Sequence, residues 1–301
     1  MPIILDPTTP EAVGDAIPLS ELIRKVRREM RDWPDEDDIT LATDDAIKTV
    51  KVADASKYFV NQTIEIDYES MIVRAAPSGT TLTVKRGAFG STPSAHVNGA
   101  SVLAKPRFPS VQIIDVLNDA VQATYPYVYR KVIDTSLVAE TDAYEYPIPL
   151  MFLDLSQAIR HIYRVDIKES GDLTYWPLRQ WRVIRGAQGS QIRLARTLPA
   201  GTSIRVFGCG PFPLLSSSAD QLDAAWPRNL EYPLVDYACS CLLASGEYGR
   251  VALDRGAIDE REQANKVGAS MNASDSAYQR FMYRVQRSGF PPMPVHAIKA
   301  F

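Results

Sequence analysis

The chain has 301 residues, of which 46% are hydrophobic and 23% are charged, and its formal net charge is −3 at pH 7. This composition is typical of a soluble globular protein with ample material for a packed core, and the slight negative charge excludes the broadly basic surface of a protein that grips nucleic acid. The three cysteines lack the spacing of zinc ligands, and no stretch approaches the about 20 apolar residues of a membrane span, so we expect no metal site, disulfide scaffold or membrane association.

An irregular arm and a helix are the first predicted elements. Residues 1–17 are rich in Pro, Thr and Asp, which predicts an irregular N-terminal arm, and they lack the basic start and apolar run of a signal peptide. The next stretch, PLSELIRKVRREMRDW, predicts a helix that Ser20 caps and that ends at Trp33-Pro34. Its apolar residues recur at helical spacing: Leu19, Leu22, Ile23, Val26 and Met30.

Opposite charges follow one another along this helix and the segment after it. The acidic segment lacks the glycine and the closing glutamate of a calcium-binding EF-hand loop, so a solvated charged loop is favoured. Because the two charges nearly cancel, a charged, solvated helix face or a patch that pairs with an acidic neighbour is favoured over a face that binds DNA. The basic residues are Arg24, Lys25, Arg27, Arg28 and Arg31, and the acidic ones are Asp32, Asp35, Glu36, Asp37, Asp38, Asp44 and Asp45.

Between residues 39 and 107 the apolar period changes from helical to alternating. The segments IKTVKV, TIEIDY, SMIVRA, TLTVKR and SVLAK predict a small β module of five or six strands, inserted into a helical frame. The stretch TLTVKRGAFGSTPSAH suggests a phosphate cradle, but no helix begins after its glycines. We therefore interpret it as a strand followed by a surface loop, with Arg86 structural or at an interface and His96 forming hydrogen bonds.

The remainder of the body, residues 108–288, predicts helices around a sheet. SVQIIDVLNDAVQATY and LEYPLVDYACSCLLASGEY are apolar at helical spacing, and a charged helical region runs from about residue 253 to 287. Between them, AYEYPIP, HIYRVDIKE, LTYWPL, QIRLAR and TSIRVFG predict an antiparallel sheet with one wetted face. With residues 18–38, this segment gives an α+β body: a helical frame with an antiparallel sheet and an inserted small β module.

The last predicted element is an extended tail, residues 289–301. FPPMPVHAIKAF is apolar yet holds three prolines, so it cannot form a helix, and leaving it exposed would be costly unless it docks on a partner. The side chains predicted to dock are Phe290, Met293, Val295, Ile298 and Phe301.

Motifs of enzymes are nearly absent. No Gly-Lys dipeptide, HExxH or GxSxG occurs, and the lone Gly208-Cys209-Gly210 is followed by prolines that block the helix of a dinucleotide site. The three histidines, His96, His161 and His296, are each favoured as structural rather than catalytic. The sequence therefore predicts a protein without enzymatic activity and without a cofactor.

The order of these segments resembles the head-to-tail adaptor, or neck, proteins of tailed bacteriophages. The resemblance is carried by LSELIRKVRREMRDW, IIDVLNDAVQATYP, AYEYPIP, GTSIRVFG and PLVDYACSCLLAS, and it covers about residues 18 to 250. The inserted segments TIEIDYESMIVRA and TLTVKRGAFGSTPSAHVNGASV resemble a β insertion of phage connector and tail-associated proteins. The tail after Arg287 shows no such resemblance.

The resemblance implies a structural protein of the virion neck, assembled in the host cytoplasm. Such adaptors form a ring, usually of twelve subunits, below the portal. The ring extends the channel through which double-stranded DNA passes without specific binding, and it docks the next neck, stopper or tail-completion protein. The implied partners are therefore copies of the chain itself, the portal and that downstream protein.

A ring needs two different, complementary faces on each subunit. We expect them at the basic helix (Arg24, Arg27, Arg28) and the acidic run (Asp35, Asp37, Asp38), and we expect the tail to lie against the portal. Two alternatives stay open: a receptor- or carbohydrate-binding protein of the tail tip, which would use the β module and its aromatic residues, and a hydrolase whose site is built from scattered residues.

Overall fold

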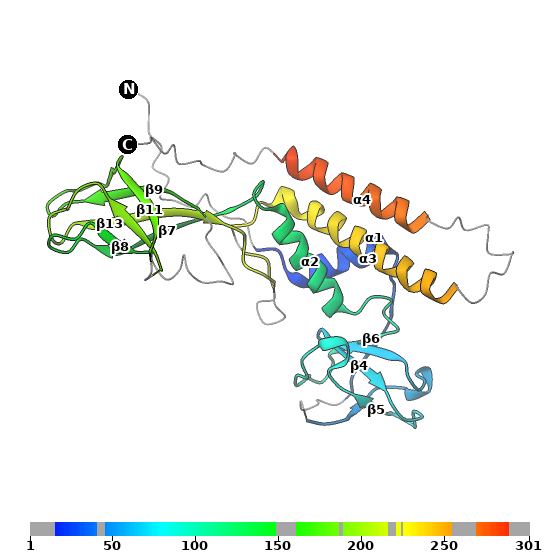
Figure 1. Cartoon of the computed structure of the whole chain (residues 1–301). Coiled ribbons are helices and arrows are strands. Elements are labelled where there is room, and N and C mark those ends of the chain that lie inside the picture. Colours follow the sequence, from blue (N-terminus) through cyan, green and yellow to red (C-terminus); the bar gives the residue numbers. More distant parts are fainter. Residues whose placement is uncertain are drawn as a thin grey trace. The chain divides into compact units, whose positions relative to one another are not determined.

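The computed structural model has an α+β fold that divides into two compact units (Figure 1). Unit 1 is drawn from Met1–Ala120 and Leu215–Arg284, and unit 2 from Val121–Leu214 and Val285–Phe301. The predicted α+β class, with helices, an antiparallel sheet and a small β module, is confirmed. The structure describes residues 16–40, 46–148, 161–186, 189–215, 221–223, 225–254 and 269–288.

The first helix of unit 1, α1 (Leu19–Met30), forms as its apolar spacing predicts. All five residues of the predicted stripe are buried, and the helix ends at Arg31, whose φ of 53° is left-handed. The predicted cap is wrong: the helix begins at Leu19, directly after Pro18, and no side chain bonds its first amides. Pro18 suits this place because its ring fixes a φ compatible with a helix start.

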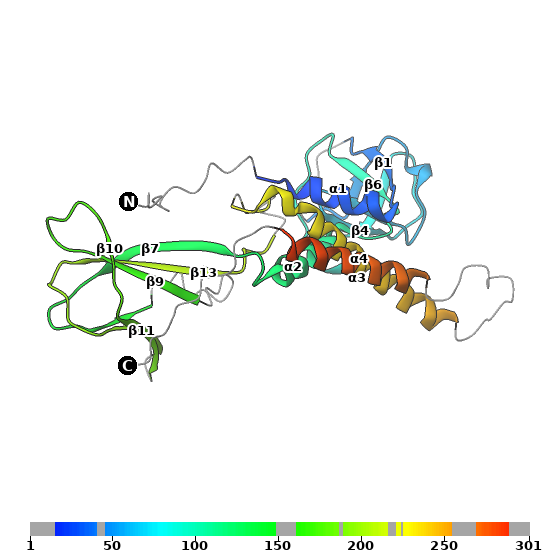
Figure 2. The ribbon, with the colours of Figure 1, turned by 90° about the horizontal axis from the view of Figure 1, so that it is seen from above.

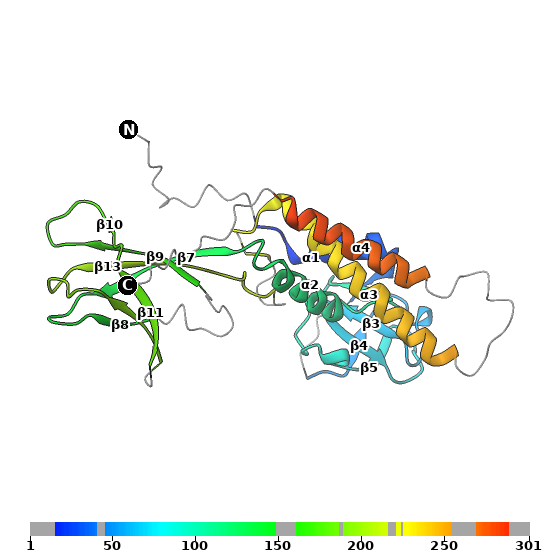
Figure 3. The same ribbon diagram turned by 45° about the horizontal axis from the view of Figure 1, so that its top comes forward.

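Three further α-helices are described: α2 (Ser110–Thr124), α3 (Glu231–Asp254) and α4 (Ala269–Gln286). The helices α3 and α4 run side by side (Figures 1 and 3), with the ring centroids of Tyr237 and Phe281 5.0 Å apart. Arg284 of α4 also lies 2.7 Å from Asp236 of α3. The predicted apolar stripes are buried: Ile113, Ile114, Leu117, Ala120 and Val121 in α2, and Leu230, Leu234, Val235, Ala238 and Leu242 in or just before α3.

The β module of unit 1 is a six-stranded antiparallel sheet with the order β1-β6-β3-β4-β5-β2. A bridge between Ile39 and Val52 connects segments next to the two edge strands, so the sheet curls into a half-barrel around an apolar core. Within the acidic segment predicted as a solvated loop, Asp35–Asp38 instead form the edge strand β1, and Asp44 and Asp45 lie outside the described residues. The strands are β1 (Asp35–Asp38), β2 (Thr49–Lys51), β3 (Thr63–Ile66), β4 (Glu69–Val73), β5 (Thr81–Lys85) and β6 (Ser101–Ala104).

Unit 2 contains two antiparallel sheets rather than the single sheet that the sequence predicts. Figure 2 shows β7, β13 and β9 of the first sheet side by side. One apolar cluster, including Tyr146, Val165, Trp181 and Ile204, receives side chains from both sheets, so neither sheet has to cover its inner face alone. The first sheet has the order β10-β9-β13-β7 and the second the order β11-β12-β8.

The sequence missed two of these strands, β7 and β11. Among the strands that it predicted, β9 begins at His161 as expected. The bounds are β7 (Arg130–Val138), β8 (Glu145–Pro147), β9 (His161–Lys168), β10 (Trp176–Pro177), β11 (Trp181–Gly186), β12 (Gly189–Leu194) and β13 (Ser203–Gly210).

In both β regions, the β module and the sheets of unit 2, the first strand pairs with the last strand. In the β module, Asp35 at the start of β1 is the register partner of Ala104 at the end of β6. In unit 2, Arg130 at the start of β7 is the partner of Gly210 at the end of β13. Each β region is thus an insertion whose two ends lie together, and the β module begins at residue 35 rather than 39.

Candidate functional site

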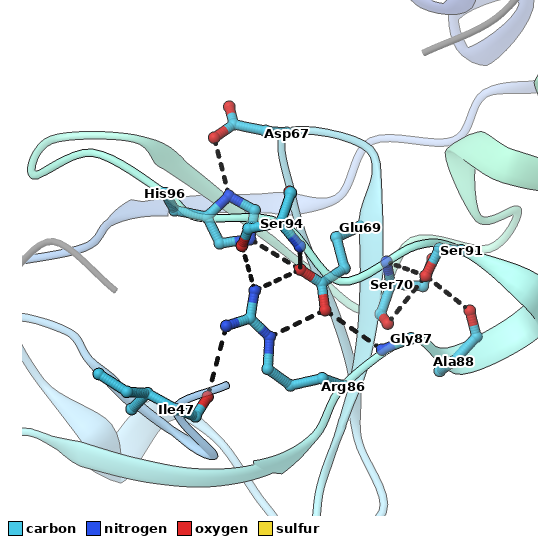
Figure 4. A network of polar contacts seen from close by, with 10 residues as sticks. All are labelled: Ile47, Asp67, Glu69, Ser70, Arg86, Gly87, Ala88, Ser91, Ser94 and His96. Carbon is cyan, nitrogen blue, oxygen red and sulfur yellow. Dashed lines mark hydrogen bonds and ion pairs between the residues drawn. The ribbon is translucent and has the colours of Figure 1, made fainter. Parts of the chain in front are cut away.

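The most densely bonded polar group of the described residues is Glu69, at the start of β4 (Figure 4). Its carboxylate accepts hydrogen bonds from the Arg86 Nε at 2.9 Å, from the backbone N–H groups of Gly87 at 3.2 Å and Ser94 at 3.0 Å, and from His96 Nε2 at 3.0 Å. The Arg86 guanidinium also donates to the carbonyl of Ser94. The segment TLTVKRGAFGSTPSAH is therefore a strand and a loop wrapped around one buried carboxylate.

The surroundings lower the pKa of Glu69 and raise the pKa of His96. Burial alone raises the pKa of Glu69, but the hydrogen bonds from His96, Arg86 and the two backbone amides outweigh it and lower the pKa to about 2. Burial alone lowers the pKa of His96, but its bonds to Glu69 and Asp67 and their charges raise it above 6.5. The raised pKa extends the pH range over which His96 is an imidazolium, in which Nδ1 donates to Asp67 at 2.9 Å.

The contacts of Glu69 and His96 fix the loop after β5 and leave neither side chain placed to act on a substrate. Both ring nitrogens of His96 are occupied by carboxylates and its side chain is fully buried, whereas a general base needs a free lone pair next to a nucleophile. Gly87 has a φ of +62°, and a Cβ there would meet the Ser91 carbonyl oxygen at 3.1 Å, so the turn requires glycine. The prediction that His96 forms hydrogen bonds from a loop is confirmed.

A second buried cluster joins the helices to the β module. The Arg27 guanidinium of α1 donates to Glu65 of β3 and to the hydroxyl of Ser110 at the start of α2, both at 3.0 Å. Glu65 also accepts the backbone N–H of Ser110 at 2.6 Å. Nearby, Asp32 accepts the backbone N–H of Arg107 at 2.9 Å. Three elements far apart in sequence are thus fixed at one buried ionic joint.

This joint separates the three predicted basic interface residues. Arg24 and Arg28 are exposed on α1, whereas Arg27 is only 7% exposed and is engaged within its own chain. Lys25 is likewise bound internally, to Glu21 at 2.9 Å and to Glu231 of α3. Only Arg24 and Arg28 of the predicted set therefore present their charge to solvent.

The predicted acidic residues divide in the same way. Asp35 and Asp38 are exposed, whereas Asp37 is half-buried, accepts a hydrogen bond from the Tyr58 hydroxyl at 3.3 Å and lies 3.7 Å from the Lys57 ammonium. The tail residues predicted to dock on the portal lie outside the described residues: Phe290, Met293, Val295, Ile298 and Phe301.

An open hollow of about 780 Å³ lies between α1 and the β module, within unit 1. Arg24, the 70% exposed Trp33 and Glu36 all line it. The basic helix and the acidic strand therefore border the same hollow of one subunit. Two partner surfaces of a ring would instead have to meet across a boundary between subunits.

In unit 2 the structure reveals a basic surface that the sequence analysis missed. On the second sheet, Arg182 of β11 stands directly opposite Arg193 of β12, and Arg196 follows just beyond the end of β12. All three arginines line an open hollow of about 520 Å³, together with Tyr144. The pairing of β11 with β12 brings them together, and their spacing of 11 and 3 residues gives no hint of it.

Other candidate groups are structural or not placed for chemistry. Burial raises the pKa of the Cys209 thiol to about 11 and that of Cys239 to about 12, so both stay protonated and unreactive at neutral pH. Within the described residues, no group of three or more His, Cys, Asp or Glu side chains is placed to hold a metal ion. None of the described helices has the length and apolarity to cross a membrane.

No protein-family model matches this chain, and no curated protein matches it in sequence. The likeness to head-to-tail adaptors therefore depends on the order and character of the chain's own elements.

Proposed function

We propose that this chain is a structural subunit of a virion neck: a head-to-tail adaptor that forms a ring below the portal, extends the DNA channel and docks the next neck or tail protein. The observation that carries the proposal is the insertion of β regions into a helical frame through paired strand ends. This is the architecture that the resemblance to adaptors implies. It keeps the helices as one frame and makes the β regions appendages that can contact neighbours.

The contacts of the described polar groups favour a structural role in an assembly over a catalytic role. The carboxylates of Glu69 and Glu65 are saturated by donors of the same chain, so both clusters fix elements in place. The charges left at the surface, such as Arg28 and Asp38, lie on different elements. Exposed charges of both signs are what a subunit needs to recognise unlike faces of its neighbours.

The proposal is tested by mixing the purified chain with the portal protein of the same particle. Native mass spectrometry and negative-stain images are expected to show a ring of chains bound to the portal ring. A chain that stays monomeric with the portal, and that is missing from purified virions, would overturn the proposal.

One feature favours the alternative of a receptor- or carbohydrate-binding virion protein. In the loop before β10, Leu173 is 95% exposed, and Trp176 at the start of β10 is 61% exposed; exposed aromatic residues are a common platform for sugars. Glycan-array binding that is lost on Trp176→Ala, together with failure to bind the portal, would favour this alternative.

A further inference from the structure

The basic hollow of unit 2 is built so that its arginines face outward. Trp181, Ile192 and Leu194 point into the apolar cluster and are at most 6% exposed. Because side chains alternate along a strand, Arg182 and Arg193 must stand on the opposite, outer face of the sheet. Arg182 and Arg196 are exposed, and the guanidinium carbon of Arg193 lies 5.1 Å from the centre of the Tyr144 ring.

The charge in this hollow is only partly neutralised by the described residues of the chain. Arg193 lies 3.5 Å from Glu145, but Arg182 and Arg196 have no carboxylate within ion-pair distance there. Like charges directly opposite each other on paired strands are destabilising. On the other sheet, by contrast, the buried Asp166 serves both Arg164 at 2.6 Å and Arg205 at 3.1 Å. The hollow therefore has the chemistry of a site for an anionic partner.

The edge strand β1 carries negative charge that the described residues of the chain only partly pair with cations. This edge strand has four consecutive acidic residues, of which only Asp37 is bound, by Tyr58 and Lys57. Asp35, Glu36 and Asp38 are exposed and have no cationic partner among the described residues. Because successive side chains of a strand point to opposite faces, Glu36 and Asp38 share one face and lie about 7 Å apart, whereas Asp35 lies on the other face with Asp37. Glu36 and Asp38 therefore present a pair of carboxylates on one side of the strand.

We propose that the hollow bounded by Arg182, Arg193 and Arg196 binds the acidic edge strand Asp35–Asp38 of a second copy of this chain. Guanidinium groups bind carboxylates through paired, charge-assisted hydrogen bonds, and the two surfaces carry complementary charge. The contact is heterologous, since different patches meet, and heterologous contacts close into rings when the rotation permits. The inference rests on the proposed function because it supplies the two faces that a ring requires.

This pairing replaces the basic helix as the partner of the acidic strand. Arg24 lines the same hollow as Glu36 within one subunit, and Arg27 is occupied by Glu65. Arg182 and Arg196 have no carboxylate within ion-pair distance among the described residues. Between residues 121 and 214 the sequence also holds eleven Arg and Lys against eight Asp and Glu, whereas the whole chain is acidic.

The test uses two full-length variants with reversed charge. One carries Arg182→Glu and Arg196→Glu, and the other carries Glu36→Lys and Asp38→Lys, which lie on the same face of β1. Each variant alone is expected to assemble at least tenfold more weakly than the wild type, measured by native mass spectrometry and light scattering with the portal present. An equimolar mixture is expected to regain assembly, because each variant's intact surface fits the intact surface of the other and the two reversed surfaces also match.

Matched controls separate this contact from a general effect of charge or folding. Arg179→Glu, in unit 2 but outside the hollow, and Asp115→Lys, on the exposed face of α2, are expected to assemble like the wild type. Circular dichroism must show that every variant is folded. A variant that fails this check is replaced by the neutral pair Arg182→Gln and Arg196→Gln, which is expected to show the same loss in reduced degree.

Three outcomes would overturn the pairing while leaving the proposed function standing: charge-reversed variants that form the wild-type ring, a mixture no better than either variant alone, or an Arg182 and Arg196 variant that assembles normally but loses binding to a DNA fragment. A wild-type chain that forms no assembly with or without the portal would instead remove the proposed function and the pairing together.

Discussion

At the scale of single residues, two carboxylates bind the same imidazole in very different surroundings. Glu69 is 1% exposed and accepts bonds from four residues, whereas the Asp67 side chain is 54% exposed and only its Oδ2 holds His96. We expect Glu69→Gln to destabilise the β module by about 3–5 kcal/mol, since it leaves Arg86 and His96 buried without a counter-charge. Amide hydrogen exchange of β4 and β5 measures this loss directly.

Asp67→Asn is the matched control for that substitution. It removes a carboxylate from the same imidazole but at a solvent-exposed position, where an ion pair contributes at most about 1 kcal/mol. Equal loss of protection in the two variants would show that Glu69 is not the centre of the network.

The same pair predicts how the stability of the module depends on pH. His96 has a folded pKa raised above 6.5, so its contribution is complete below pH 6.5 and is lost as the pH rises through the folded pKa. Glu69 has a folded pKa of about 2, so its contribution is complete above its ordinary value of 4.5 and is lost as the pH falls towards 2. Both contributions are fully present between about pH 4.5 and 6.5.

We therefore expect the difference in unfolding free energy between wild type and His96→Asn to be largest in that window and to shrink towards pH 9. Urea unfolding at a series of pH values measures it. A difference that stays constant from pH 5 to 9 would mean that the imidazole is neutral throughout.

At the scale of elements, the ionic joint decides how α1, β3 and α2 are held. Arg27→Ala would leave Glu65, which is 2% exposed, as a buried carboxylate without its cation. We expect a loss of about 3–5 kcal/mol, seen as a lower urea midpoint for the helical circular dichroism signal.

Arg28→Ala tests the specificity of that loss, because Arg28 is the next residue on the same helix but is exposed. Its expected effect is within about 0.5 kcal/mol. If the two alanine variants unfold alike, Arg27 does not act through Glu65.

The helices were predictable from the sequence because their apolar stripes are local. The apolar residues of each helix lie on one face, which must be buried whatever the helix packs against. These residues lie between Leu19 and Met30 in α1 and between Ile113 and Val121 in α2. The acidic strand was not predictable, because four carboxylates have low β propensity. β1 forms because its backbone pairs with β6 from Asp35↔Ala104 to Asp38↔Ser101, a long-range contact that no local pattern reveals.

The candidate sites were predictable only in part, for the same reason. His96 and Arg86 were identified in the right segment, but their shared partner Glu69 lies 17 or more residues earlier and reads as one acidic residue of an ordinary strand. Arg24, Arg27 and Arg28 look alike in the sequence, and only the positions of Glu65 and Ser110 make Arg27 structural. The opposed Arg182 and Arg193 required the register of β11 and β12.

At the scale of the whole molecule, the tail gives a prediction that follows from the proposed function. Deleting residues 289–301 is expected to leave the circular dichroism and the unfolding midpoint of the remaining chain within error of the full-length protein, but to weaken binding to the portal at least tenfold. Co-sedimentation with portal rings measures the binding. Unchanged binding by the folded truncation would exclude the tail as the docking segment.

The paired ends of the β regions also determine which insertions and deletions the chain can accept during evolution. Register partners of antiparallel strands lie about 5 Å apart, a gap that two residues span. A shortened gene that joined residue 34 to 105, or 129 to 211, would therefore still leave a continuous backbone between α1 and α2, or between α2 and α3. Either β region could therefore be exchanged or lost as one continuous segment of the gene without changing the order of the described helices.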